Sequence, residues 1–183
     1  MVAGALRNSR IDVPDAPGLR PTPDRVRETL FNWLMPVIDG ARCLDLFAGT
    51  GALGIEALSR GAGECVFVEQ DAKLAAALRG TLERLKVANG HVRNEPAERF
   101  LASGGAPFDV AFVDPPFAAG LWRSSLSALD AGWLKPGGYV YVEAPVGHDR
   151  AVPSGWTLHR ESRAGDVRYA LYRPGVSGGE GVR

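Results

Sequence analysis

The sequence has few of the residues from which disulfides and metal sites are built. Only two cysteines occur among 183 residues, Cys43 and Cys65, and both lie in strand-like apolar stretches, "ARCLDLF" and "ECVFVE". Buried, reduced thiols are therefore expected rather than a disulfide. The three histidines are scattered and show no ligand spacing. We expect no metal site.

The sequence also lacks a long apolar run and an excess of charge. No uninterrupted apolar stretch approaches the roughly 18 residues of a membrane span, and the start "MVAGALRNSR" has no secretory apolar core. These absences favour a cytoplasmic protein without a membrane partner. The formal net charge of zero argues against nucleic-acid binding by bulk electrostatics alone. The ends are nevertheless mildly basic and the middle acidic, which is typical either of ordinary surface variation or of flanks that touch a polyanion.

The hydrophobic pattern predicts one domain between an extended arm and a disordered tail. Residues 1–21 are proline-rich and form the arm, residues 22–173 form the domain, and the glycine-rich residues 174–183 have no periodicity. The first helix is expected over 22–34, with Thr22 as its cap and Pro23 at its first position. Further helices are expected at 51–61, 72–87, 97–103 and 119–131. Strands are expected at 41–47, 64–69, 91–94, 108–113, 139–144 (after a turn at "KPGG"), 156–162 and 167–173.

This alternation of strands and helices predicts an α/β fold. We expect a mostly parallel, seven-stranded sheet with helices on both faces, connected by right-handed crossovers. The last two strands have no helix between them and should form an antiparallel hairpin at one edge. Ligands of such sheets bind beyond the carboxyl ends of the strands.

A glycine-rich motif follows the first expected strand. Gly49, Gly51 and Gly54 form G-x-G-x-x-G between a strand and a helix, and Glu69 ends the next strand 20 residues after Gly49. This spacing suits both dinucleotide and methyltransferase folds, with the acid on ribose hydroxyls. Asp45, inside the strand, could hold an ammonium group, which S-adenosylmethionine has and NAD lacks.

The second motif is "DPPF", residues 114–117, at the end of the expected strand 108–113. Prolines donate no backbone N–H, so the carbonyls beside them stay free as acceptors. A carboxylate and a carbonyl held together are complementary to an exocyclic amino group, and Phe117 can stack on the ring that carries it. The alternative is a rigid turn with a capping aspartate.

These stretches resemble a known family. "LDLFAGTGALGIEALSRG" and "FVDPPF" are similar to the motifs of class I methyltransferases that act on amino nitrogens, with a Rossmann-like fold. "GLRPTPDRVRETLFNWL" closely resembles the RsmD family, and the similarity covers about residues 4–173. The resemblance implies S-adenosylmethionine-dependent methylation of guanine N2 in bacterial 16S rRNA, at guanine 966, within a 30S assembly particle, by a monomeric enzyme.

The resemblance also implies roles for individual residues. The catalytic motif is Asp114, Pro115, Pro116 and Phe117; the cofactor residues are Asp45, Phe47, Gly49, Gly51, Glu69, Gln70 and Ala97. Candidate contacts to rRNA phosphates are Arg7, Arg10, Arg20, Arg25 and Arg27, of which Arg25 or Arg27 could instead pair with Glu28 or Asp24. With an ordinary pKa near ~3.9, Asp114 is expected to be ionised and to accept hydrogen bonds from the amino group together with the Pro115 carbonyl.

The chain departs from the family pattern at two places. Pro96 stands where an Asp or Asn usually contacts the adenine amino group, so Glu95, Glu98 or the Ala97 backbone must substitute. The amino-terminal stretch "VAGALRNSR" starts late and has Asn8 in place of a glycine, which predicts a shortened RNA-binding arm.

Three alternatives remain open from the sequence. The same fold and cofactor serve methyltransferases of DNA adenine or cytosine and of protein glutamine. The glycine spacing and Glu69 also suit an NAD-dependent oxidoreductase. A non-catalytic, cofactor-binding rRNA assembly module would keep the fold without the reaction.

Overall fold

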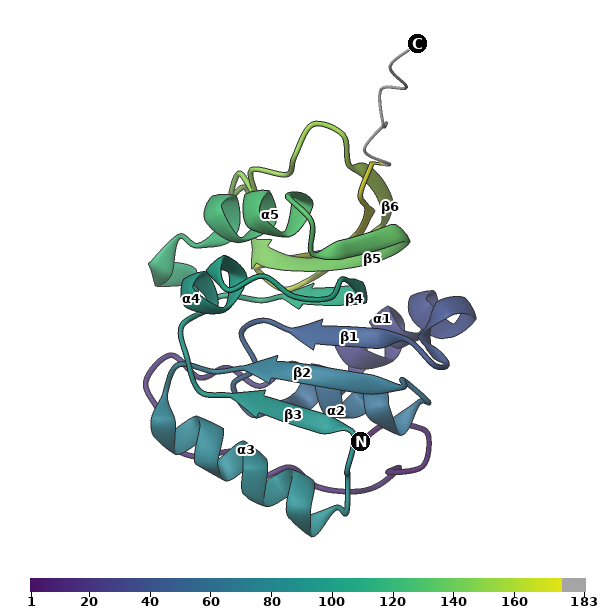
Figure 1. Cartoon of the computed structure of the whole chain (residues 1–183), viewed down its shortest axis with the longest axis vertical. Coiled ribbons are helices and arrows are strands. Elements are labelled where there is room, and N and C mark those ends of the chain that lie inside the picture. The colour runs from purple at the N-terminus through teal and green to yellow at the C-terminus, as the bar shows by residue number, and fades with distance from the viewer. Residues whose placement is uncertain (176–183) are drawn as a thin grey trace.

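A seven-stranded sheet forms the centre of the protein. The computed structural model describes residues 1–175, and its strand order is β3-β2-β1-β4-β5-β7-β6 (Figure 1). All neighbouring strands are parallel except β5–β7 and β6–β7, so the expected edge hairpin and the fold class are confirmed. The strands are β1 (Arg42–Asp45), β2 (Glu64–Val68), β3 (Gly90–Arg93), β4 (Phe108–Val113), β5 (Leu134–Pro145), β6 (Thr157–Ala164) and β7 (Val167–Arg173).

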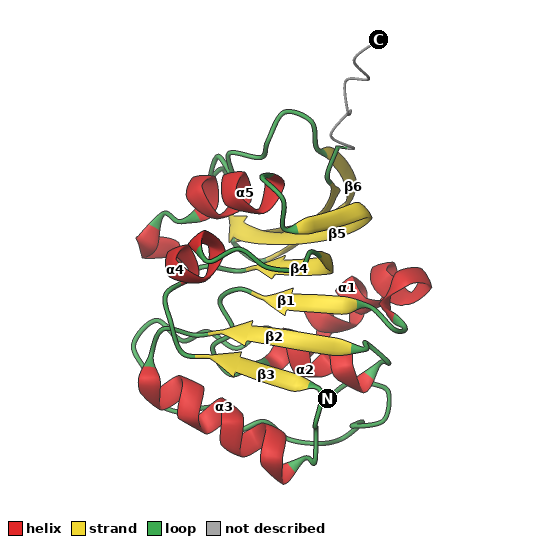
Figure 2. Ribbon diagram, in the orientation of Figure 1, coloured by secondary structure: helices red, strands yellow, loops and turns green. Residues whose placement is uncertain are grey.

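Helices cover both faces of this sheet (Figure 2). They are α1 (Asp24–Ile38), α2 (Ala52–Ser59), α3 (Ala72–Arg84), α4 (Ala97–Ala102), a 3-10 turn η1 (Phe117–Ala119) and α5 (Trp122–Asp130). Alternate strand residues face opposite sides: Cys43, Phe67 and Phe112 pack with α1, α2 and α3, whereas Leu44 and Val66 pack with α4 and α5. None of the helices within residues 1–175 is long and apolar enough to cross a membrane.

Two local expectations were wrong. Helix α1 begins after Pro23 because the backbone of Pro23 is not helical (ψ 146°). Pro23 is the cap residue, and its ring has no acceptor for a side-chain cap hydrogen bond. Thr22 lies outside the helix, where its carbonyl accepts a bond from Arg27 (3.3 Å). The "KPGG" stretch belongs to β5 rather than to a turn before it. Gly138 there approaches the Asp109 carbonyl so closely that a Cβ atom would lie 2.9 Å from the oxygen, and the register shifts at this point.

The amino-terminal arm contains no helix or strand and is fastened to α2. The Val2 amide donates to Glu56 Oε1 (3.1 Å) and the Leu6 amide donates to Ser59 Oγ (3.0 Å). Asn8 has a left-handed backbone (φ +66°), which asparagine tolerates better than most residues. Most of the expected disordered tail, residues 176–183, lies outside the described residues.

The close packing of α2 on β2 leads to a first prediction. A Cβ atom at Gly54 would lie 2.3 Å from Phe67 Cε1 and 2.7 Å from Cys65 Sγ, whereas at Gly80 it would meet nothing within 4 Å. We expect Gly54→Ala to destabilise the protein by about 1–3 kcal/mol through overpacking. Gly80→Ala, the matched control in exposed α3, should stabilise it by about 0.5–1 kcal/mol. Denaturant unfolding of both variants measures the difference, and equal midpoints would contradict the packing argument.

Candidate active site

A cavity of about 680 Å³ lies at the carboxyl ends of the central strands, on the side of Figure 1 where the arrowheads of β1, β2 and β4 lie. Its wall comes from the end of the arm, the loop after β1, the end of β2, the start of α4, the loop after β4 and the β6–β7 turn. This volume is within the range of ordinary small-molecule sites. The position is the one expected for the ligands of such sheets.

Four acidic residues reach this cavity from four strands or their ends. Each lies two residues after a core residue that packs against α1, α2 or α3. Because side chains two residues apart in a strand point to the same face of the sheet, all four acids lie on the face that α1, α2 and α3 cover. The acids are Asp45 after Cys43, Glu69 after Phe67, Asp114 after Phe112, and Glu143 after Tyr141. The arm covers this face of the sheet ends with residues 16–23.

Asp45 is buried at the start of α2. Only 2% of it is exposed, and its Oδ2 accepts a bond from the Gly54 amide (3.1 Å). Burial raises the pKa of Asp45 to about 7, the Gly54 hydrogen bond opposes this, and the Glu69 charge adds to it. The carboxylate is therefore poorly compensated within the chain and is complementary to a cationic group in the cavity.

Glu69 is fixed between two backbone amides. Its Oε2 accepts from the Gly49 amide (2.8 Å) and its Oε1 from the Asp71 amide (2.9 Å). Each carboxylate oxygen keeps a further lone pair for a ligand hydroxyl. Phe47 and Gln70 also line the cavity.

The three glycines of the motif have different roles. Gly49 has φ +55° and lines the cavity against Leu19, whose Cδ1 would be 3.1 Å from an added Cβ. Gly51 does not line the cavity; it has φ +82°, and a Cβ there would lie 2.4 Å from Leu78 Cδ1 in α3. Gly51 and Gly54 thus allow helix packing, and Gly49 allows close approach to a ligand.

At the end of β4, Asp114 faces Glu143, a residue that the sequence interpretation missed. Burial raises the pKa of Asp114 well above its ordinary value, as do the Glu143 and Asp45 charges, while the Arg20 guanidinium opposes the shift. The expectation of an ordinary pKa for Asp114 is therefore wrong for the ligand-free protein. The missed signal was "YVYVEA", an apolar strand that ends in an acid, as "CLD" and "FVD" do.

Phe117 lines the cavity, and the guanidinium of Arg20 lies over its ring. The guanidinium carbon of Arg20 lies 4.4 Å from the centre of the Phe117 ring. The Trp122 ring lies beside it, with centroids 5.9 Å apart. Arg20, expected to contact phosphate, thus lies over the aromatic ring, and its charge also acts on Asp114 and Glu143, which its place in an irregular arm did not indicate.

Pro96 precedes the first residue of α4, where it acts as the cap residue. Ala97, Glu95 and Glu98 all line the cavity. Glu95 Oε1 is buried without a hydrogen bond, although an Arg93 nitrogen lies 3.2 Å away in an ion pair of poor hydrogen-bond geometry. Glu95 is therefore a cavity-lining residue with one carboxylate oxygen that lacks a hydrogen bond.

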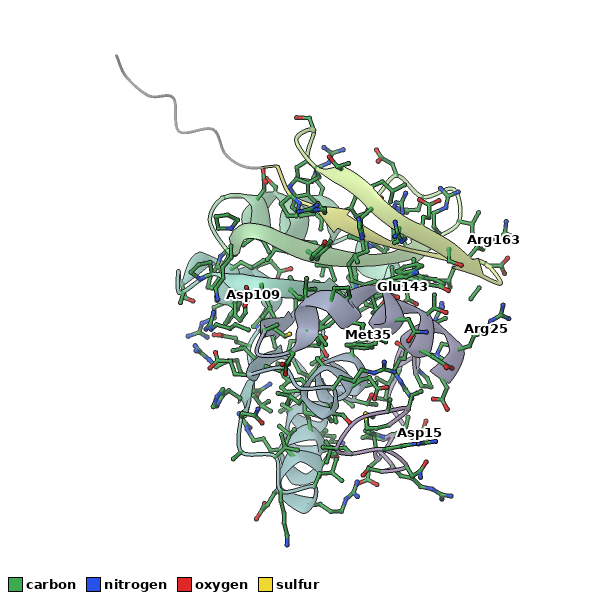
Figure 3. All side chains as sticks on the ribbon, turned by 90° about the vertical axis from the view of Figure 1, so that its right-hand side faces the viewer. Asp15, Arg25, Met35, Asp109, Glu143 and Arg163 are labelled. Carbon is green, nitrogen blue, oxygen red and sulfur yellow. The ribbon has the colours of Figure 1, made fainter. Side chains whose placement is uncertain are left out.

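The five candidate arginines differ in accessibility. Arg7, Arg10, Arg20 and Arg25 are exposed, whereas Arg27 is only 8% exposed and pairs with Asp24. Figure 3 shows Arg25 and Arg163 extending from the same side of the molecule as Glu143. The pairing of Arg27 with Asp24 was one of the two alternatives that the sequence left open, and Arg163 was not anticipated.

Comparison with known proteins extends over nearly the whole chain. The family model described as Conserved hypothetical protein 95 matches residues 1–173. The chain is 49% identical to "Ribosomal RNA small subunit methyltransferase D" of Escherichia coli over 180 residues (97% of this chain, 91% of the relative). It is 43% identical to the protein of the same name in Haemophilus influenzae over 178 residues (94% and 92%). A solved structure, "Putative methyltransferase yhhF from Escherichia coli", has a TM-score of 0.88 at 46% identity and covers 95% of this chain and 96% of its own.

The raised pKa of Asp45 predicts a pH-dependent stability in the ligand-free protein. The pKa of Asp45 is about 7 in the folded protein and near 3.8 in the unfolded chain. The folded state therefore holds this proton more tightly, and the resulting contribution to the free energy of unfolding, present at low pH, is lost as the pH rises through 7. Asp45→Asn keeps an acceptor for the Gly54 amide without the charge. We expect its melting temperature to exceed that of the wild type more at pH 8.5 than at pH 5.

Thermal unfolding across this pH range checks the prediction. Asp12→Asn is the matched control, because the Asp12 side chain is 73% exposed. A difference between Asp45→Asn and wild type that stays constant with pH would show that Asp45 does not titrate in this range.

Proposed function

This chain belongs to the RsmD family, and we propose that it methylates the N2 amino group of a guanine in small-subunit ribosomal RNA with S-adenosylmethionine as methyl donor. Family membership favours an rRNA methyltransferase over the oxidoreductase and the methyltransferases of DNA or protein. The finer parts of the proposal are the guanine N2 atom, position 966 of 16S rRNA, a 30S assembly particle as substrate, a monomeric enzyme and a cytoplasmic site of action.

One observation carries the proposal: the Asp114–Phe117 turn faces the same cavity as the glycine loop and Glu69. A cofactor held by the loop and an amino group held by the turn would therefore meet in one space. A non-catalytic assembly module would need the first of these sites only.

The residues of the cavity fit S-adenosylmethionine, which supplies an electrophilic methyl group on a sulfonium. The uncompensated Asp45 carboxylate suits the ammonium group of the donor, and Glu69 suits its ribose hydroxyls. Ala97 and Glu95 line the α4 end, where the Ala97 backbone and the Glu95 carboxylate suit the adenine amino group in place of the side chain that Pro96 lacks.

Asp114 and the Pro115 carbonyl handle the target amine in this proposal. Guanine N2 is a weak nucleophile because its lone pair is delocalised into the ring. Two acceptors that take its two N–H bonds localise the lone pair and aim it at the methyl group. Such alignment can lower the activation free energy of a reaction by roughly 7–11 kcal/mol.

Phe117 provides the stacking face for a guanine flipped out of its RNA. In the RNA-free protein a flat cation, the Arg20 guanidinium, already lies over this ring. We propose that the base takes this position while Arg20 moves toward phosphate. Base stacking of this kind contributes about 1–3 kcal/mol.

The rim of the cavity suits the RNA backbone. Arg7, Arg10 and Arg25 are exposed, and Arg163 immediately precedes the β6–β7 turn residues that line the cavity. Guanidinium groups bind phosphate through paired N–H donors. Arg27 is buried, so we assign it to the start of α1 rather than to RNA.

The proposal is tested by methyl transfer to small-subunit particles that lack the modification. Labelled S-adenosylmethionine should label one guanine at N2, located by mapping the labelled base. Asp114→Ala should lower the rate more than 100-fold because the amine loses its acceptor, with little change in cofactor affinity by calorimetry. Asp109→Asn, at the other end of β4, is the control and should retain activity. Label at another atom, or in protein or DNA, would refute the proposed substrate.

Replacement of Phe117 tests the stacking role separately. Phe117→Leu keeps apolar bulk without a ring, so the transfer rate to particles should fall about 5- to 150-fold while cofactor affinity stays unchanged. Phe117→Trp preserves a stacking face and should retain most of the activity. Equal rates for all three proteins would remove Phe117 from substrate recognition.

A further inference from the structure

Glu143 lies directly beside Asp114 in the cavity. Strands β4 and β5 are parallel with Val113 opposite Val142, so the residues that follow are neighbours across the sheet. Their carboxyl groups are within hydrogen-bonding reach of each other. Two carboxyls this close, one buried and one half-buried, cannot both ionise freely, because each charge disfavours the other.

Glu143 is held rigidly in this position. The Tyr141 hydroxyl donates to its Oε2 (2.9 Å), and the Trp122 indole donates to its backbone carbonyl (2.9 Å). Tyr141 is fully buried and Glu143 is only 7% exposed. The tyrosine hydroxyl is a single neutral donor, and one such donor offsets only part of the cost of burying a carboxylate.

The other charged and titratable groups around the pair come from three further elements. Arg20 faces both carboxyls from the arm, and Asp45 faces Asp114 from β1. Tyr169 of β7 lies opposite Glu143 in the register. The Arg20 charge thus opposes the raised pKa of Asp114 and Glu143, whereas the Asp45 charge adds to that of Asp114.

We propose that Glu143 is a positioning residue for the methyl transfer: it holds a second negative charge against Asp114, so that Asp114 takes the proton that the target amine loses. This inference rests on the proposed function and extends it. Asp114 by itself would accept hydrogen bonds from the amine; with Glu143 beside it, Asp114 becomes a base.

The step balances in atoms and charge. The N2 lone pair forms the new N–C bond as the S–C bond of the donor breaks, with its electron pair left on sulfur. The extra proton on N2 then passes to an oxygen of Asp114. A cationic donor and an anionic carboxylate are thereby replaced by a neutral thioether and a neutral carboxylic acid, and the proton leaves through the open cavity after the product.

The pKa directions support this role. Burial raises the pKa of Glu143, against the Tyr141 hydrogen bond and the Arg20 charge, and the pKa of Asp114 is raised further by Glu143 itself. A base is most effective when its pKa lies near the working pH, which an ordinary carboxyl does not reach.

Two variants should move the pH dependence of the rate in opposite directions. Glu143→Gln removes the charge that raises the pKa of Asp114, so the acidic limb of kcat should move to lower pH by about one unit, with kcat lowered about 10- to 100-fold. Tyr141→Phe removes a donor to the ionised pair, so the acidic limb should move to higher pH. Asp45 is unchanged in both variants, so its titration would not move the acidic limb of kcat in opposite directions.

The rates are measured on small-subunit particles at saturating S-adenosylmethionine. Glu64→Gln, at the amino end of β2 and paired with Arg42, is the matched control and should leave kcat and its pH profile unchanged. Circular dichroism establishes that each variant is folded. If Glu143→Gln is folded and keeps the wild-type rate and profile, the proposal is overturned.

A second measurement does not depend on methyl transfer. The carboxyl carbon of Asp114, followed by NMR in the cofactor-free protein, should titrate at lower pH in Glu143→Gln than in the wild type. An unchanged midpoint overturns the pairing of the two acids. If the wild type labels no guanine, the proposed function fails, and the titration still decides whether Glu143 controls Asp114.

Discussion

The site depends on three carboxyl groups that are buried or half-buried in one cavity, two of which, Asp114 and Glu143, are opposed by the charge of Arg20. Asp45, Asp114 and Glu143 come from three adjacent strands and face the same side of the sheet. Burial raises the pKa of all three, and the charges of Glu143 and Asp45 raise the pKa of Asp114 further. Such a site costs free energy in the empty protein, and a cationic ligand recovers part of that cost. The preference for a positively charged methyl donor thus follows from the same arrangement that strains the fold.

The sheet makes this arrangement possible because its central strands β1, β4 and β5 are parallel to one another and covered on both faces. Both faces are packed, by α1, α2 and α3 on one side and by α4 and α5 on the other. The strands therefore cannot slide relative to one another without moving core residues into solvent. Fixed register brings the acids together at the strand ends, and the stiff Pro115–Pro116 pair prevents Asp114 from turning away.

The arm belongs to the site as much as the strands do. Its beginning is fastened to α2, and its last residues line the cavity. Through Leu19 it lies against Gly49, and through Arg20 it lies against Phe117. The Arg20 charge also opposes the raised pKa of Asp114 and Glu143, so the arm contributes to the charge balance of the cavity.

Local sequence determined most of the fold and much of the site. Apolar runs, helix periodicity and short connections specify elements whose type depends on nearby residues, and motifs such as "DPPF" carry their own stiffness and acceptors. Only the tertiary structure decided which side chains meet. Glu143 is 29 positions from Asp114 in sequence, and Arg20 is 97 positions from Phe117. Their contacts depend on strand register and on the path of an irregular arm. For the same reason, the raised pKa of Asp114 could not be read from its motif: it depends on neighbours that the chain brings from other strands.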